Sequence, residues 1–305
     1  MTLCLAWLTK HEVYLASDSR LTNSYGGIVT DDATKIFRIN VEVYGSTPSE
    51  TPNEEPPLLH QTTYGLCFAG SYIGGSTIAS TIEEVLSNIQ AAPMSDISIE
   101  NLSDIALAVY KQISRQLTSI HGEGGISELL LAGHCLLTNE FKLYKFSPTI
   151  KDQMVDYEKK EIKLIELPVF LGDNSAKVKA NSLLSNLSNE YTYLHLLRDV
   201  IRDEEVRTVG GNIQIGQFKA ERFKTLGIVE YSLLEAEDGY LEVKDEFKFK
   251  GFSLNLDDSE LRRGDINILK PLCNPFENER NAYYEQVMNR ISEKENEIIK
   301  RSREE

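Results

Sequence analysis

The chain has 305 residues, 41% apolar side chains and a formal net charge of −15. This length and apolar content are enough for a packed core in one large domain or in two. The negative charge argues against nucleic acid or an anionic membrane surface as a partner, because both require local positive charge.

The cysteines and histidines show no metal-ligand spacing. The four cysteines (Cys4, Cys67, Cys135 and Cys273) lie far apart, and none of the five histidines is spaced to act with a second histidine or a cysteine. The apolar start at residues 3–8 is too short for a signal-peptide core or a membrane span. We therefore expect a cytoplasmic protein with free thiols, no metal and no cofactor.

The most informative stretch is residues 1–38, in which a threonine directly follows the initiator methionine. Removal of Met1 is chemically plausible because Thr2 is small, and it would leave a free α-amino group beside the Thr2 hydroxyl. One residue can then act as both nucleophile and base. An α-amino group titrates at about 7.7–8.0, and a nearby ammonium lowers that pKa further.

Apolar runs at residues 3–8 and 13–16 predict two short strands, joined by a polar turn at 9–12. In such a hairpin the second strand retraces the first and brings Asp18 back towards Thr2. A further predicted strand at 31–39 carries Lys35 at its centre. We therefore expect Thr2, Asp18 and Lys35 to meet as nucleophile, orienting carboxylate and ammonium.

Residues 41–60 interrupt this pattern with glutamates and prolines and contain no lysine or arginine. Such a segment buries too little apolar surface to order itself, so it predicts an acidic, proline-rich loop inserted between two strands. A solvated surface loop is the simpler interpretation, and partner recognition is the alternative.

In the rest of the chain, stretches with the apolar periodicity of strands alternate with stretches that have the periodicity of helices. The predicted elements are a strand at 62–69, helices at 78–89 and 102–120, strands at 128–137, 141–147 and 162–170, helices at 175–188 and 191–203, strands at 210–218, 224–233 and 241–249, and a helix at 277–303. The apolar stripe of the last helix fades into charge, so it docks either on its own domain or on a neighbouring subunit.

Several short motifs together resemble proteasome β-subunits and their bacterial relatives. These are Thr2, the segments 16–22 and 34–39, and the Phe-Ala-Gly-Ser sequence at 68–71. The Met-Thr-x-Cys opening followed by Ser-Asp-Ser-Arg is most similar to the bacterial Anbu branch. The resemblance spans residues 2–232. It implies an N-terminal nucleophile hydrolase of the α+β class, with a four-layer αββα sandwich at 1–235 and a C-terminal hairpin and helical extension at 236–305.

The resemblance also implies roles for individual residues. The Gly70 N–H would be the oxyanion-hole donor. Asp173 takes the place of a serine that hydrogen-bonds the catalytic amine, and a carboxylate there would favour the protonated amine and raise its pKa. Alternatively, Asp173 caps the following helix. Asp203 resembles the acidic residue that orients the amine, although the gap between it and Gly210 is longer than in the family.

These features predict a threonine peptidase that cleaves peptides or unfolded proteins as a homo-oligomeric ring or spiral, with an unfoldase as a possible partner. Two alternatives remain open. One is a proteasome-like scaffold with little or no peptidase activity, which acts through residues 41–60 and the C-terminal extension. The other is a hydrolase of a small amide, because the same nucleophile serves both reactions.

Overall fold

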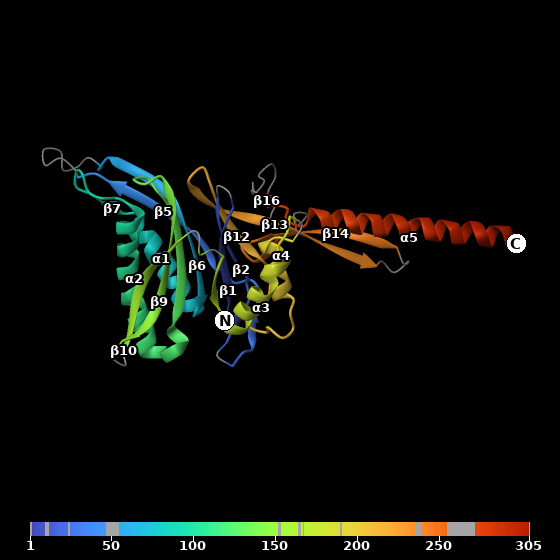
Figure 1. Ribbon diagram of the computed structural model, residues 1–305, viewed down its shortest axis with the longest axis horizontal. Helices are drawn as coiled ribbons and strands as arrows, with labels where there is room; N and C mark the ends of the chain where they lie inside the picture. Colours follow the sequence, from blue (N-terminus) through green and yellow to red (C-terminus); the bar gives the residue numbers. More distant parts are fainter. Residues whose placement is uncertain are drawn as a thin grey trace.

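The computed structural model of the chain describes residues 2–9, 12–23, 25–46, 55–151, 154–163, 166, 168–189, 191–235, 240–254 and 272–304. It is an α+β structure with two large sheets, and helices flank them (Figure 1). None of the helices in these ranges is long and apolar enough to cross a membrane.

The eight-stranded sheet combines the start of the chain with its C-terminal part. In spatial order its strands are β11 (Val169–Gly172), β1 (Leu3–Leu8), β2 (Val13–Ser17), β12 (Gln214–Lys219), β13 (Arg222–Glu235), β14 (Leu241–Phe249) and β15 (Phe252–Leu254), and β16 (Leu272–Cys273) pairs with β13. Neighbouring strands are antiparallel except β13 and β16, which run parallel.

The six-stranded sheet is built from the middle of the chain. Its spatial order is β10 (Met154–Ile162), β9 (Glu140–Lys151), β8 (Ser127–Cys135), β6 (Leu58–Gly70), β5 (Ile36–Tyr44) and β7 (Ile89–Gln90). A separate two-stranded sheet joins β3 (Leu21–Thr22) to β4 (Ile28–Thr30). The long β5–β6 hairpin is the connection that holds residues 45–57.

Helices α1 (Tyr72–Leu86) and α2 (Ile99–His121) contact the six-stranded sheet, and a 3₁₀ turn, η1 (Gly122–Gly125), follows α2. Helix α3 (Asn174–Leu183), the 3₁₀ turn η3 (Leu184–Asn186) and α4 (Tyr193–Ile201) lie beside the eight-stranded sheet. Helix α5 (Glu277–Glu304) starts against β13 and β14 and then extends away from the rest of the chain (Figure 1).

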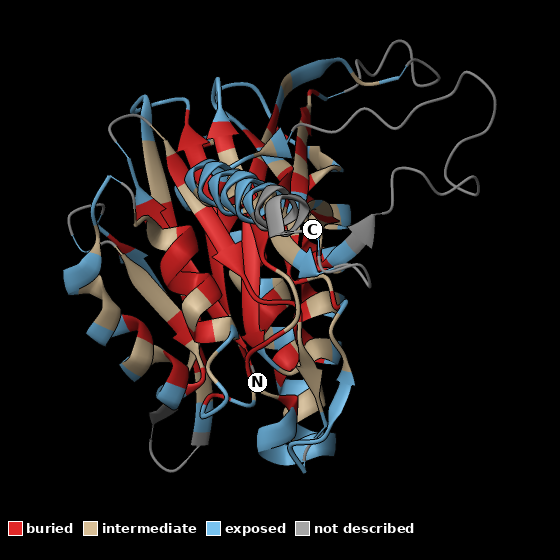
Figure 2. Ribbon diagram, turned by 90° about the vertical axis from the view of Figure 1, so that its right-hand side faces the viewer, coloured by how far each residue is buried: buried red, intermediate tan, exposed pale blue. Residues whose placement is uncertain are grey.

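The strand pattern explains why three apolar clusters form. Along β1, Leu3, Leu5 and Trp7 belong to the cluster shared with α3 and α4, whereas Cys4 and Ala6 belong to the cluster between the two sheets. Successive side chains of a strand point to opposite faces, so one short strand serves both clusters. A third cluster joins the six-stranded sheet to α1 and α2. The buried strands at the centre of Figure 2 contribute side chains to these clusters.

Three predictions about the strands were wrong. The strand predicted at 31–39 begins only at Ile36, as β5, so Lys35 lies just before the strand and not at its centre. The predicted strand at 162–170 is two strand ends in different sheets, because β10 ends at Ile162 and β11 begins at Val169 after Pro168, which has no N–H to donate. Strand β10 itself was missed, because it is a charged edge strand in which Tyr157 and Ile162 are the buried apolar side chains.

The predicted loop at 41–60 is shorter than expected. Strand β5 continues to Tyr44 and β6 starts at Leu58, and most of what lies between, 47–54, is outside the described residues. The domain boundary at 235 falls between β13 and β14, which pair along their length from Gly227 to Glu235. The division into a domain and an extension therefore stays a prediction.

Phe223 joins the two large sheets. Its ring lies on Gly65 of β6 and on Gly216 of β12, so closely that a Cβ at either glycine would be 2.5 Å or 2.1 Å from ring atoms. The Phe223 N–H also donates to the Thr63 hydroxyl at 2.7 Å. Gly65 is therefore required by packing between the two sheets, and Gly216 by packing between neighbouring strands of one sheet.

We expect Gly65→Ala to lower the free energy of unfolding by about 1–3 kcal/mol, because the added methyl overpacks the Phe223 ring. In a Phe223→Leu background the same change should have a smaller effect, since the clashing atoms are gone. Urea unfolding of the four proteins measures this coupling. Gly124→Ala is the control, because a Cβ there meets nothing within 4 Å. Equal effects at Gly65 and Gly124 would contradict the packing argument.

Candidate active site

Thr2 is buried at the start of β1, with 2% of its surface exposed. Its carbonyl accepts a hydrogen bond from the Asp173 N–H at 2.9 Å. The neighbouring Gly172 has φ +106°, and a Cβ there would lie 1.8 Å from the Thr2 carbonyl oxygen. Thr2 is thus held between β1 and the end of β11, where only glycine fits.

Asp18 lies directly after β2, and the β1–β2 hairpin returns it to the start of β1, as the sequence predicts. Its side chain is fully buried and accepts four hydrogen bonds. Oδ1 accepts from the Leu3 N–H and the Lys35 ammonium, both at 3.0 Å. Oδ2 accepts from the N–H groups of Arg20 and Gly210, both at 3.1 Å. The carboxylate therefore touches the residue next to Thr2.

Lys35 lies immediately before β5, and 1% of its side chain is exposed. Its ammonium donates to Asp18 Oδ1 at 3.0 Å and to the Arg20 carbonyl at 2.6 Å. A buried charge is tolerated only when it is paired and hydrogen-bonded, and both conditions are met here. Lys35, Asp18 and the start of β1 form one buried cluster.

Gln214 was missed by the sequence analysis. Its side-chain oxygen accepts from the Lys35 N–H at 2.9 Å, and its amide nitrogen donates to the carbonyls of Ala33 at 2.7 Å and Asp18 at 3.2 Å. This one amide ties together the two segments that supply the ion pair. The signal in the sequence was a polar residue between Ile213 and Ile215 in the middle of the strand predicted at 210–218.

A cavity of about 230 Å³ lies next to the residues that contact the Thr2 carbonyl. Its lining residues are Ala69, Gly70, Ile126, Glu128, Pro148, Gly172 and Asp173. Gly70 has φ +106°, and a Cβ on it would lie 2.5 Å from the Ile126 carbonyl oxygen, so this position also requires glycine. Two wall residues, Gly172 and Asp173, are those that contact the Thr2 carbonyl. The cavity is therefore beside the predicted nucleophile.

Asp173 is the N-cap of α3, which was the alternative left open for it. Its carboxylate accepts from the Ser175 hydroxyl and, at 3.1 Å, from the Ala176 N–H. Burial raises the pKa of this carboxyl, but the hydrogen bonds from Ser175 and the Ala176 backbone hold the pKa below its usual value. Asp173 is therefore an ionised carboxylate at neutral pH on the cavity wall.

Asp203 lies at the end of α4, where its carboxylate pairs with Lys179 at 2.7 Å and accepts from the Glu205 N–H at 2.9 Å. These contacts are separate from the Asp18 and Lys35 cluster, and the amine-orienting role implied for Asp203 stays a prediction. Within the described ranges no group of three or more histidine, cysteine, aspartate or glutamate side chains is arranged to hold a metal ion.

The whole fold was compared with solved structures, and Anbu proteins are among those that match. The structure of Anbu, the ancestral β-subunit, from Yersinia bercovieri matches with a TM-score of 0.50 at 15% identity over 73% of this chain and 86% of that chain. The chain shares its fold with Anbu. The helical assembly of the Anbu complex from Pseudomonas aeruginosa matches with a TM-score of 0.50 at 14% identity, over 73% of this chain and 85% of that chain.

No protein-family model and no curated protein matches the sequence. At this level of identity the likeness to Anbu concerns the fold, and the roles of individual residues rest on the geometry described above.

Gly172→Ala should lower the free energy of unfolding by more than the roughly 1–2 kcal/mol that a left-handed backbone costs a residue with a Cβ. The excess arises because the methyl would displace the Thr2 carbonyl. Gly26→Ala is the matched control, since Gly26 also has positive φ (+80°) but its Cβ would meet nothing within 4 Å. Urea unfolding compares the two, and equal losses would show that Gly172 does not hold Thr2.

Asp18→Asn should lower the free energy of unfolding by about 3–5 kcal/mol, because it leaves the Lys35 ammonium buried without a counter-charge. Asp31→Asn breaks the half-exposed pair with Arg20, whose atoms approach to 2.7 Å, and should cost about 1 kcal/mol or less. Chemical denaturation of both variants measures the difference. A loss for Asp18→Asn no larger than that for Asp31→Asn would contradict the assignment of the buried pair.

Proposed function

We propose that the chain is a proteasome-like threonine hydrolase that cleaves peptide bonds, with Thr2 as its nucleophile once Met1 has been removed. One observation carries the proposal. The buried Lys35 ammonium shares Asp18 Oδ1 with the N–H of Leu3, the residue that follows Thr2, and the cavity bordered by Gly70 is also lined by Gly172 and Asp173, which contact the Thr2 carbonyl. These contacts support a site in which a nucleophile, a fixed cation and space for a substrate lie close to one another.

In the proposed reaction the Thr2 α-amine takes the hydroxyl proton while Oγ forms a bond to the carbonyl carbon of the substrate. The carbonyl oxygen gains the electron pair of its π bond and becomes an oxyanion. When the oxyanion collapses, the C–N bond breaks and the amine hands the proton to the departing nitrogen. A water molecule, deprotonated by the same amine, then hydrolyses the acyl ester on Thr2.

The surrounding residues have distinct proposed tasks. Lys35 keeps the amine neutral by charge repulsion, because a nearby cation lowers the pKa of an ammonium. Asp18 fixes Lys35 and the first residues of β1. The Gly70 N–H serves the oxyanion, in the same way as backbone donors in other acyl-transfer enzymes. The small cavity beside Gly70 would receive one side chain of the substrate.

The finer features of the fold belong to the same proposal. We assign the two helical layers and two sheets to the αββα sandwich of N-terminal nucleophile hydrolases, with residues 236–305 as an extension. The helical assembly named for the Pseudomonas aeruginosa Anbu complex supports a homo-oligomer here as well. Peptides or unfolded proteins are the proposed substrates, and we propose that the chain acts in the cytoplasm.

A scaffold with little or no activity is the second candidate, and Asp173 favours it. The Asp173 N–H already binds the Thr2 carbonyl, so this ionised carboxylate lies close to the start of β1. A negative charge there would stabilise the protonated amine and oppose Lys35. The two candidates differ in whether any turnover depends on Thr2.

The decisive experiment measures hydrolysis of a fluorogenic peptide library and of unfolded casein by protein whose loss of Met1 has been verified by intact mass. We expect Thr2→Ala to abolish turnover and Thr2→Ser to retain part of it. Lys35→Met should lower kcat by about 10²–10⁴-fold, the usual contribution of acid–base catalysis.

Lys142→Met is the control for loss of a lysine, because Lys142 pairs with Glu161 between β9 and β10 and is not among the residues that line the cavity beside Gly70. Its activity should equal that of the unmodified protein. Circular dichroism verifies that each variant is folded. Processed, folded protein with no turnover, or with the same turnover in Thr2→Ala, would reject the hydrolase and favour the scaffold.

A further inference from the structure

A second and larger cavity, of about 530 Å³, lies at the opposite end of β1 from Thr2. It is bordered by the β1–β2 hairpin, the segment that leads into α4, and the segment between β16 and α5. The lining residues are Trp7, Thr9, Tyr14, Leu187, Ser188, Tyr191, Thr192, Tyr193, Leu194, Ile215, Cys273 and Pro275. Trp7 lies five positions after Thr2, roughly 17 Å away at the usual rise of a strand, so the two cavities are distinct.

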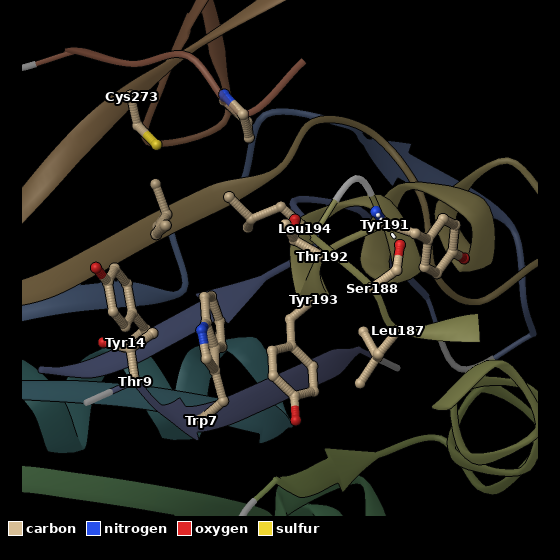
Figure 3. A pocket seen from close by; sticks show the side chains of 12 residues that line it. Trp7, Thr9, Tyr14, Leu187, Ser188, Tyr191, Thr192, Tyr193, Leu194 and Cys273 are labelled. Carbon is tan, nitrogen blue, oxygen red and sulfur yellow. Dashed lines mark hydrogen bonds between the residues drawn. The ribbon is translucent and has the colours of Figure 1, made fainter. Parts of the chain in front are cut away.

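Aromatic rings form one side of this cavity. Trp7 and Tyr14 are stacked with their centroids 4.9 Å apart and their planes 8° from parallel. Tyr193 packs on the other side of Trp7, at 5.4 Å and 34°. In Figure 3 these three rings lie together, and Cys273 lies across the space from them. Flat aromatic groups stack favourably on such surfaces.

The lining carries no formal charge at neutral pH. None of the lining residues is a lysine, arginine, histidine, aspartate or glutamate. Burial raises the pKa of Tyr14, Tyr191, Tyr193 and Cys273, so these hydroxyls and this thiol stay protonated at neutral pH. An anionic ligand would lose its hydration here without gaining a partner of opposite charge, and the hydroxyls of Tyr14 and Tyr191 already donate to the carboxylates of Glu12 and Asp199. The cavity therefore selects against anions.

We propose that this cavity binds an uncharged, planar aromatic small molecule that packs against the wall formed by Trp7, Tyr14 and Tyr193 and contacts Cys273. Its volume lies within the range of about 300–1,000 Å³ that is typical of small-molecule sites, and mostly apolar walls with a few hydroxyl groups are the usual lining. A ligand there touches both the body of the fold and the segment that leads into α5. The proposal is independent of catalysis at Thr2.

Trp7 makes the test direct, because it is the single tryptophan of the chain. The probes are 2-naphthylmethanol, which is neutral and aromatic, 2-naphthoate, which has the same rings and a charge, and the saturated decahydro-2-naphthylmethanol. The first should quench or shift Trp7 emission and bind at least about tenfold more tightly than the other two, because only it is both neutral and flat.

A thiol reagent gives a second readout on the unmodified protein. Cys273 is partly exposed, whereas Cys4, Cys67 and Cys135 are buried. Bound 2-naphthylmethanol should slow the labelling of Cys273 by a maleimide in proportion to the occupancy measured from Trp7. This readout requires no substitution and therefore holds even if a cavity variant fails to fold.

Cys273→Phe should fill the cavity and lower the affinity for 2-naphthylmethanol at least about tenfold, as overpacking removes the space for a ligand. Leu272→Phe is the matched control. It adds a ring at the next position of β16, where the side chain points to the opposite face and is 50% exposed, and it should leave binding unchanged.

The inference is overturned if none of the three probes changes Trp7 emission, or if naphthoate or the saturated alcohol binds as well as 2-naphthylmethanol. It is also overturned if Cys273 labelling is unaffected at saturating probe, or if folded Cys273→Phe binds as tightly as Leu272→Phe. A probe that acts by driving self-association, seen as an increase in mass by light scattering, would instead indicate that the cavity is a contact between copies of the chain.

Discussion

The carboxylate of Asp18 is the constraint on which the rest of the site depends. Its two oxygens accept from the Leu3 N–H, the Lys35 ammonium and the N–H groups of Arg20 and Gly210. These donors come from four separate segments of the chain, which the fold must bring to one buried point. An ionised group in this position is stable only because every donor is present, so the ion pair and the fold support each other.

Two further contacts convert this cluster into a site. Gly172 lets β11 approach the Thr2 carbonyl, and Gln214 holds the backbone of Lys35 to that of Asp18 and Ala33. Both act on the backbone, and Gly172 and Asp173, which contact the Thr2 carbonyl, also line the cavity. The site is therefore positioned by main-chain hydrogen bonds between strands, which move less than side chains on a surface loop.

Much of this structure could be predicted from local patterns in the sequence. The two apolar runs and the polar turn between them were sufficient to predict the β1–β2 hairpin, and the hairpin was sufficient to bring Asp18 to the start of β1. The meeting of Asp18 and Lys35 was also predicted, but with Lys35 at the centre of a strand, whereas it lies just before β5. The overall α+β fold came from the resemblance to proteasome β-subunits, and it agrees with the likeness to Anbu structures.

Contacts between distant segments were not predictable. Strand β10 has mostly charged residues and is recognised as a strand only through its pairing with β9. Gln214 carries no catalytic signature, and its role depends on three backbone groups from other segments. The close approach of Phe223 to Gly65 and Gly216 likewise has no local signal, because it depends on how two sheets face each other.

The central claim is that the Lys35 cation, held by Asp18, keeps the amine of Thr2 neutral near pH 7. The most direct measurement is the pKa of that amine, from a ¹⁵N NMR titration of protein labelled at threonine. The account predicts a pKa below the usual range of about 7.7–8.0 and a rise towards that range in Lys35→Met. An amine pKa within or above that range in the unmodified protein, or no Thr2 amine resonance because Met1 is retained, would contradict it.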